Sequence, residues 1–156
     1  MAAVPGPAKN CMSANVSREF VDSNILVYLF DHSAKTKQAS AAQLIERLWN
    51  SGTACLNVQV LQEFFVSVTR KVPRPLSSAE ALERVREFSA WRVFAPGAPD
   101  VATAIEIHRQ TNLSFWDAMI VQAASELGCD LIWSEDLSNG HLVRGVRIQN
   151  PFVIRP

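Results

Sequence analysis

Four acidic residues of this sequence stand next to apolar segments, where folding would turn their side chains inward. They are Asp22, Glu63, Asp117 and Asp136. A buried ionised carboxylate is unfavourable unless it is paired with a cation or bound to a metal ion. If folding brings these acids together, the group requires a cation, and the chemistry to expect is that of a metal site.

Two of the acids follow short apolar runs that are typical of buried strands. Asp22 ends the run that begins at Glu19, and Asp136 follows the run from Asp130 to Trp133. In open parallel α/β sheets, ligands bind in the crevice beyond the carboxyl ends of the strands. Both acids are therefore expected at the same edge of one sheet.

The other two acids are expected on helices. Asp117 projects within the apolar stripe of the helix that opens at Ser114, but Ser114 and Asp117 also have the spacing of a capping box. The stripe consists of Trp116, Ile120, Val121, Ala124 and Leu127. Glu63 lies on the polar flank of its helix, where a solvated glutamate is the simpler interpretation.

The strand-end acids also have simpler interpretations. Asp22 is placed to cap a helix that begins near Asn24, and Asp136 to cap a turn at 137–140. Glu135 competes with Asp136 for any role. Asn24 and Ser134 each stand two residues from one of these acids, where a polar side chain either bonds the local backbone or orients the carboxylate.

Strand-like and helix-like segments alternate along the chain. Apolar periodicity predicts helices over 25–30, 38–49, 58–72, 77–90, 100–110 and 114–127. Strands are predicted at 19–22, 53–57, 92–95, 130–133 and 146–149. Strands separated by helices imply βαβ crossovers. The predicted fold class is α/β, with three α/β/α layers and a central parallel sheet of about four or five strands.

Composition sets bounds on organisation and partners. The 156 residues fit one domain at 18–156 after a flexible leader at 1–17. Lys plus Arg and Asp plus Glu number 15 each, so long duplex DNA is not an expected ligand. No apolar run approaches the roughly 18 residues of a membrane helix. The three cysteines lie far apart without a Cys-x-x-Cys pair, which favours a reducing, cytoplasmic location.

Four segments, in order, resemble the PIN domain family and, within it, the VapC-type toxin ribonucleases of toxin-antitoxin pairs. They are Phe20 to Leu26, Gln62 to Phe64, Ser114 to Ile120 and Trp133 to Leu137. The end of the chain, Val146 to Phe152, is also similar. No one segment is specific, but their order and spacing match from about residue 18 to 152.

The resemblance implies an acidic pocket for Mg²⁺ or Mn²⁺, formed by Asp22, Glu63, Asp117 and Asp136 and supported by Asn24 and Ser134. Hard cations bind a few carboxylates while keeping several waters, which agrees with such a site. The implied activity is a metal-dependent endoribonuclease that cuts unpaired RNA loops, as the toxin of a pair with a small antitoxin. A homodimer is also implied. Exposed side chains among Trp49, Phe64, Phe65 and Val68 are candidates for an interface with the second copy or the antitoxin, although core packing is the simpler interpretation of each.

The alternative to a nuclease is a PIN-like module of weak or no activity that binds RNA or acts as a scaffold. Other chemistries find little support. Ser23 lacks the setting of a nucleophile elbow. The three histidines do not have the spacing of zinc ligands.

Overall fold

The computed structural model describes residues 16–153. The predicted leader at 1–17 falls outside this range except for Val16 and Ser17, which belong to no helix or strand. Among residues 16–153, no helix combines the length and the apolar character that crossing a membrane requires.

The helices and strands of the described range alternate as predicted, with ends that differ by up to a few residues. The strands are β1 (Arg18–Val21), β2 (Ala54–Asn57), β3 (Arg92–Phe94), β4 (Cys129–Trp133), β5 (Leu142–Val143) and β6 (Val146–Gln149). The helices are α1 (Ser23–Tyr28), α2 (Lys35–Ser51), α3 (Val58–Arg70), α4 (Ser78–Phe88), α5 (Ala98–Gln110) and α6 (Phe115–Glu126).

The strands form one sheet in the order β3-β2-β1-β4-β6-β5. All neighbouring pairs are parallel except β5 and β6, which are antiparallel. The predicted fold class is thus confirmed, with one strand more than expected. Strand β5 was missed because two residues are too few to show a periodic pattern. It joins β6 through Arg144 and Gly145, whose φ angles are 49° and 80°.

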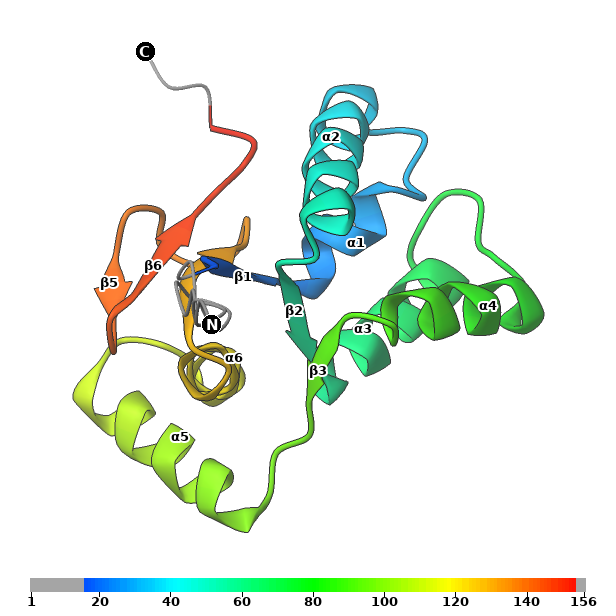
Figure 1. Cartoon of the computed structure of the whole chain (residues 1–156). Helices are drawn as coiled ribbons and strands as arrows, with labels where there is room; N and C mark the ends of the chain where they lie inside the picture. The colour runs from blue at the N-terminus through cyan, green and yellow to red at the C-terminus, as the bar shows by residue number, and fades with distance from the viewer. Residues whose placement is uncertain (1–15, 154–156) are drawn as a thin grey trace, which may run out of the picture.

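Helices cover both faces of the sheet. In Figure 1, α1 and α2 lie on one side of the sheet, and α5 and α6 lie on the other. Helices α3 and α4 pack against each other, and α3 also contacts β2. The core between these layers contains the fully buried side chains of Phe20, Leu56, Phe64 and Ile132.

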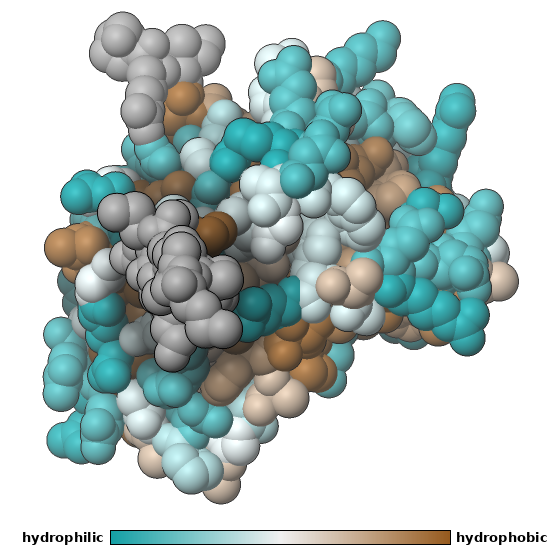
Figure 2. Space-filling model, viewed as in Figure 1, coloured by the Kyte–Doolittle hydropathy of each residue, from teal (hydrophilic) through white to brown (hydrophobic). Residues whose placement is uncertain are grey.

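Helix α4 shows how local sequence signals define an element. The Ser77 hydroxyl accepts a bond from the Glu80 N–H at 3.2 Å, and the Glu80 carboxylate accepts one from the Ser77 N–H at 2.8 Å. The predicted capping box is therefore confirmed. Ala81 and Phe88 are buried, whereas the region of α4 in Figure 2 is covered by hydrophilic side chains.

The apolar stripe of α6 was predicted wrongly at its start. All side chains from Ala118 to Ala124 are buried, but Trp116 is 62% exposed. Periodicity assigns Trp116 to the same face as Ile120. The helix is enclosed by its neighbours only after its first turn, which a periodic pattern cannot indicate.

Candidate active site

The carboxyl ends of β1 and β4 bring Asp22 next to Ser134. Val21 pairs with Trp133 in the parallel register, and the Asp22 N–H donates to the Trp133 carbonyl at 3.0 Å. One residue further, Ser134 Oγ donates to Asp22 Oδ2 at 2.7 Å. The strand order changes direction between β1 and β4, and such switch points are where open α/β sheets bind ligands.

Asp22 is buried, with 4% of its surface exposed, and it caps α1. Its Oδ1 accepts a hydrogen bond from the Ser23 N–H at 2.7 Å. The helix-cap interpretation is therefore correct. It does not exclude a second role, because Oδ2 points to the side chains of Ser134 and Asn24 and so toward the strand ends.

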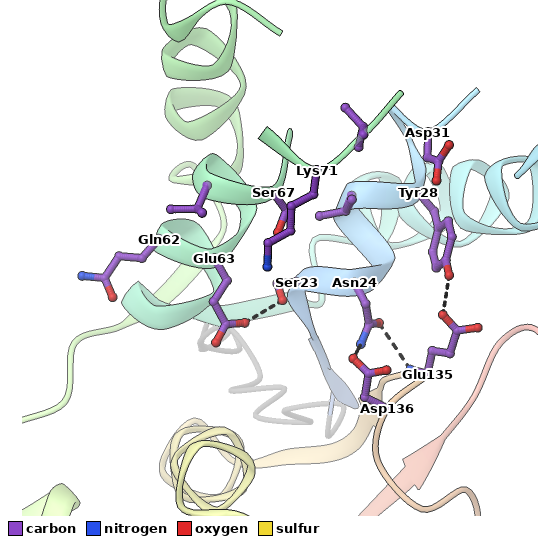
Figure 3. Close-up of a pocket in the computed structure, with 13 residues that line it drawn as sticks. Ser23, Asn24, Tyr28, Asp31, Gln62, Glu63, Ser67, Lys71, Glu135 and Asp136 are labelled. Carbon is purple, nitrogen blue, oxygen red and sulfur yellow. Dashed lines mark hydrogen bonds between the residues drawn. The ribbon is translucent and has the colours of Figure 1, made fainter. Parts of the chain in front are cut away.

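Asn24 lies between two of the predicted acids. Its Nδ2 is 3.1 Å from Asp22 Oδ2 and 3.0 Å from Asp136 Oδ2. Its Oδ1 accepts a bond from the Glu135 N–H at 3.3 Å. Figure 3 shows Asn24 directed at the loop that follows β4. One amide side chain therefore holds the acids from β1 and β4 in a fixed relation.

Glu63 joins this group from α3. Ser23 Oγ donates to Glu63 Oε2 at 2.7 Å, and Gln59 Nε2 donates to Glu63 Oε1 at 3.0 Å. Glu63 is half-buried and lines the cleft described below, so it combines these two hydrogen bonds with access to solvent. Sequence reasoning considered Ser23 only as a nucleophile and missed its bridging role. The i, i+4 spacing of Gln59 and Glu63 was the available signal for the second contact.

Asp117 is held within its own helix. Ser114 Oγ accepts from the Asp117 N–H at 3.1 Å and donates to Asp117 Oδ2 at 2.6 Å. The capping interpretation is thus correct. A bond of 3.4 Å from Gln59 Nε2 to the Trp116 carbonyl places this first turn beside α3. Within the described residues, Asp117 makes no hydrogen bond to the other three acids.

Hydrogen bonds connect three of the acids. We name this group, Asp22, Glu63 and Asp136, the acidic cluster. None of the three forms an ion pair with a lysine, arginine or histidine of residues 16–153. Burial raises the pKa of Asp22 to about 6, and the nearby charges of Glu63 and Asp136 add to this effect. Hydrogen bonds from Ser134 and Ser23 oppose it. The cluster therefore carries negative charge that the described chain does not compensate.

Glu135, which competes with Asp136 in the sequence, has a different environment. Its carboxylate forms an ion pair with Lys37 and accepts a hydrogen bond from the Tyr28 hydroxyl. Burial raises its pKa, but the bonds from Lys37 and Tyr28 outweigh this effect and lower it. Because Glu135 is already neutralised while Asp136 bonds to Asn24, the geometry favours Asp136 as the fourth acid.

The donor set of the acidic cluster suits a hard divalent cation. Mg²⁺ and Mn²⁺ prefer carboxylate oxygens, and Mg²⁺ usually keeps several waters when few protein ligands bind it. In the described part of the chain, no three His, Cys, Asp or Glu side chains already stand in a metal-holding arrangement. Ser23 and Asn24 occupy the positions between the carboxylates. The residues fit a divalent ion in chemistry and charge, and binding requires these neutral donors to turn aside.

The acidic cluster opens into a cleft of about 660 Å³ between α1, α3 and the loop after β4. Glu63 and Asp136 line it together with Asn24, Ser67 and Lys71. Figure 3 shows these side chains around a common space. A substrate in this cleft would have direct access to two members of the cluster.

Known structures share this architecture. Mycobacterium tuberculosis VapC20, a sarcin-ricin loop cleaving toxin, is 22% identical, with a TM-score of 0.57 over 76% of this chain and 91% of that one. A toxin-antitoxin complex from Klebsiella pneumoniae is 17% identical, with a TM-score of 0.64 over 88% of this chain and 100% of that one. VapBC2 from Rickettsia felis, bound to a promoter DNA fragment, is 14% identical, with a TM-score of 0.60 and coverages of 85% and 97%.

At these identities the structural likeness establishes the fold alone. No curated protein sequence matches the chain at a significant level. The sequence model of the PIN domain, in contrast, matches residues 20–138, which include every acid considered above. With this match and the parallel sheet that carries the acids, the chain belongs to the PIN domain family.

Proposed function

We propose that this protein is a metal-dependent endoribonuclease that hydrolyses RNA phosphodiester bonds, and that it is the toxin of a toxin-antitoxin pair. The observation that carries the proposal is the acidic cluster, which is uncompensated, lies at the switch point of a PIN-family sheet and opens into a cleft. A binding module would have no need to gather like charges where a phosphate backbone must approach.

The chain supplies distinct roles around this cluster. Asp22, Glu63 and Asp136 would hold Mg²⁺ or Mn²⁺, with Asp117 contributing from the first turn of α6. Ser134 would orient Asp22 through its bond of 2.7 Å, whereas Asn24, which lies 3.1 Å from Asp22 Oδ2, would turn aside when the ion binds. When bound, a divalent ion lowers the pKa of water for attack on phosphorus and stabilises the leaving oxygen.

The choice of RNA as substrate rests on the resemblance to PIN-domain ribonucleases, and the charge and shape of the chain agree with it. With a net charge of +0, the chain can hold a nucleic acid only by local contacts, which disfavours long duplexes. Unpaired RNA loops suit a confined cleft, because their bases can be splayed out and read individually.

An assay on purified protein tests the proposal. Structured RNA is incubated with the protein in Mn²⁺ or in EDTA, and the products are resolved on a denaturing gel. Cleavage only with metal supports the nuclease. A gel shift without products in either condition would replace it with the RNA-binding module. The Asp22→Asn variant, purified in the same way, controls for a contaminating nuclease because it should not cleave, whereas Glu135→Gln should cleave like the wild type.

The toxin role requires a protein partner, and the surface offers a place for one. An apolar groove of about 280 Å³ between α3 and α4 is lined by Leu61, Phe65 and Leu82, among others. Phe65 is 38% exposed and Trp49 46%, so both remain candidate interface residues. Phe64 and Val68 are fully buried and are not available to a partner.

We propose a small antitoxin and a second copy of the chain as the partners, in a cytoplasm that also holds the RNA. Co-purification with the product of an adjacent short reading frame, and loss of RNA cleavage in that complex, would support the antitoxin. Sedimentation of the isolated chain at micromolar concentration tests the homodimer, and a purely monomeric boundary would contradict it.

A further inference from the structure

Four polar residues stand at intervals of four along α3, in a row that turns gradually around the helix, from buried Gln59 to exposed Lys71. They are Gln59, Glu63, Ser67 and Lys71, the last of which caps the helix at its carboxyl end. Side chains spaced by four lie above one another on a helix. We name this row the α3 stripe. From Gln59 to Lys71 it covers about 18 Å at 1.5 Å per residue. Glu63, the member that belongs to the acidic cluster, divides the stripe into two arms.

Lys71 marks the end of one arm. It is exposed, and it is the one lysine or arginine among the described residues that line the cleft. Figure 3 shows its side chain directed into the cleft, on the side where Ser23 and Glu63 lie. Several other basic residues of the described chain, such as Lys37 and Arg47, form ion pairs with acids, whereas Lys71 forms none there. Its ammonium group is thus available to an anion that enters the cleft.

The cleft around Lys71 is otherwise acidic. Asp31, Glu63, Glu135 and Asp136 all line it, and of these only Glu135 has a cationic partner within the described residues. A lysine that merely neutralised the cleft would be expected to pair with one of these carboxylates. Because Lys71 forms no ion pair with these carboxylates, its ammonium group can bind a phosphate group that enters the cleft.

Trp116 marks the end of the other arm. Gln59 Nε2, which bonds to Glu63 Oε1 at 3.0 Å, also reaches the Trp116 carbonyl at 3.4 Å. The Trp116 side chain packs edge-on against Phe115 with ring centroids 5.1 Å apart, and the residue stays 62% exposed. It has the largest exposed fraction among the aromatic residues of the described chain. Exposed aromatic rings beside a nucleic-acid path are stacking platforms for unpaired bases.

We propose that an unpaired RNA strand follows the α3 stripe, with one phosphate bound by Lys71 and one base stacked on Trp116, on opposite sides of the acidic cluster. This inference rests on the proposed ribonuclease function. The stripe of about 18 Å leaves room for only a few nucleotides. The bound segment is therefore short and single-stranded, and a duplex cannot present a free base to Trp116.

Binding of a fluorescent single-stranded octaribonucleotide tests the two contacts separately. Lys71→Ala and Trp116→Ala are compared in the Asp22→Asn background with Mg²⁺, so that the RNA stays intact. Lys35→Ala and Trp49→Ala are the matched controls. Lys35 is an exposed lysine outside the cleft, and Trp49 is a 46% exposed tryptophan that also packs on one aromatic ring, that of Trp91.

Lys71→Ala and Trp116→Ala should both weaken RNA binding, but with a different dependence on salt. Lys71→Ala should weaken binding about tenfold at low salt and reduce the slope of log affinity against log salt by about 0.7, the loss of one phosphate contact to a single strand. Trp116→Ala should weaken binding about tenfold without changing that slope, and Trp116→Phe should restore most of it. Both controls should bind RNA within about twofold of the Asp22→Asn background.

Other outcomes overturn the inference and leave the proposed function identifiable. If the wild type cleaves RNA with Mn²⁺ but Lys71→Ala and Trp116→Ala bind and cleave as it does, the strand follows another path and the nuclease stands. If both substitutions weaken binding as expected but the wild type yields no products, the nuclease fails and the binding path stands. A change in sedimentation for Trp116→Ala with unchanged RNA binding would assign Trp116 to a protein interface instead. Failure of the Asp22→Asn background to bind the RNA at all also overturns the inference.

Discussion

Two carboxylates close together in the chain, Glu19 and Asp22, have pKa values that are shifted in opposite directions. The Glu19 carboxylate on β1 accepts hydrogen bonds from Nη1 and Nη2 of Arg47, both at 2.8 Å, and from the Trp133 indole N–H at 2.6 Å. Burial raises the pKa of Glu19, but these bonds outweigh it and lower the pKa. Asp22, three residues further along, receives only neutral donors, and its pKa is raised to about 6 by burial and by Glu63 and Asp136.

The same contrast recurs after β4, where Glu135 pairs with Lys37 and the adjacent Asp136 has only the Asn24 amide. The chain thus has the means to neutralise an acid near either strand end, and it does so three positions from Asp22 and one position from Asp136. Charge left uncompensated beside such pairs indicates a ligand that is not part of the chain. In our proposal, Glu19 and Glu135 serve the fold, whereas the acidic cluster binds a cation.

Loss of the Asp22 charge should have the largest effect on RNA cleavage. Asp22→Asn removes the charge but keeps the size and the oxygen that caps α1, so RNA cleavage should fall by about 10³-fold or more while folding is retained. Single-turnover cleavage rates and circular dichroism measure the two properties. Glu19→Gln is the control on the same strand and should keep its cleavage rate. Equal activity of both variants would remove Asp22 from the site.

The second prediction separates the two interpretations of Asp117. Ser114→Ala removes the hydroxyl that caps α6, which should lower the free energy of unfolding by about 1 kcal/mol and leave cleavage nearly unchanged. Asp117→Asn should lower cleavage by about 10²-fold, because the carboxylate charge is lost from the metal site. Chemical denaturation and cleavage rates check the pair. If both variants lose stability but cleave RNA at the wild-type rate, Asp117 acts only as a helix cap.

A third pair of variants tests the difference between the adjacent acids Glu135 and Asp136. Asp136→Asn should reduce cleavage by about 10²-fold, because one of the carboxylates that would hold the ion loses its charge. Glu135→Gln should cleave at close to the wild-type rate and lose at most about 1 kcal/mol, since Lys37 is 40% exposed and the pair is screened by solvent. The reverse ranking in the cleavage assay would make Glu135 the fourth acid.

The smallest expected effect concerns stability rather than activity. An ion that binds only the folded chain adds about 1.4 kcal/mol at ten times its Kd. For a chain of this size, that corresponds to a rise in Tm of about 3 to 6 °C. Thermal unfolding in Mn²⁺ against EDTA measures it. The triple variant of Asp22, Glu63 and Asp136 to their amides should show no shift, and a shift equal to the wild type would place the ion elsewhere.

Much of the fold could be predicted from the sequence because its signals are local. Apolar periodicity located the helices, and the capping box at Ser77 and Glu80 located the start of α4. The placement of Asp22 and Asp136 at strand ends required only the rule for parallel sheets. Strand β5 and the exposure of Trp116 depend on which elements happen to lie nearby, and that information is not local.

The cluster itself shows the same division. Asn24 and Ser134 could be named because they stand beside strand-end acids. The contacts of Glu63 with Ser23 and of Glu135 with Lys37 join residues 40 and 98 positions apart, so spacing alone could not reveal them. Contacts between distant residues determine which acids are neutralised. They distinguish Glu135, which pairs with Lys37, from Asp136, whose carboxylate accepts a hydrogen bond from the Asn24 amide.

The central claim is that the acidic cluster binds a divalent cation. Anomalous diffraction at the manganese edge, from crystals grown with Mn²⁺, tests this most directly because it locates the ion independently of activity. The predicted result is a peak in contact with Asp22 and at least one of Glu63 and Asp136, with the Asn24 amide turned away. Full manganese saturation in solution combined with no peak among these carboxylates would contradict the account.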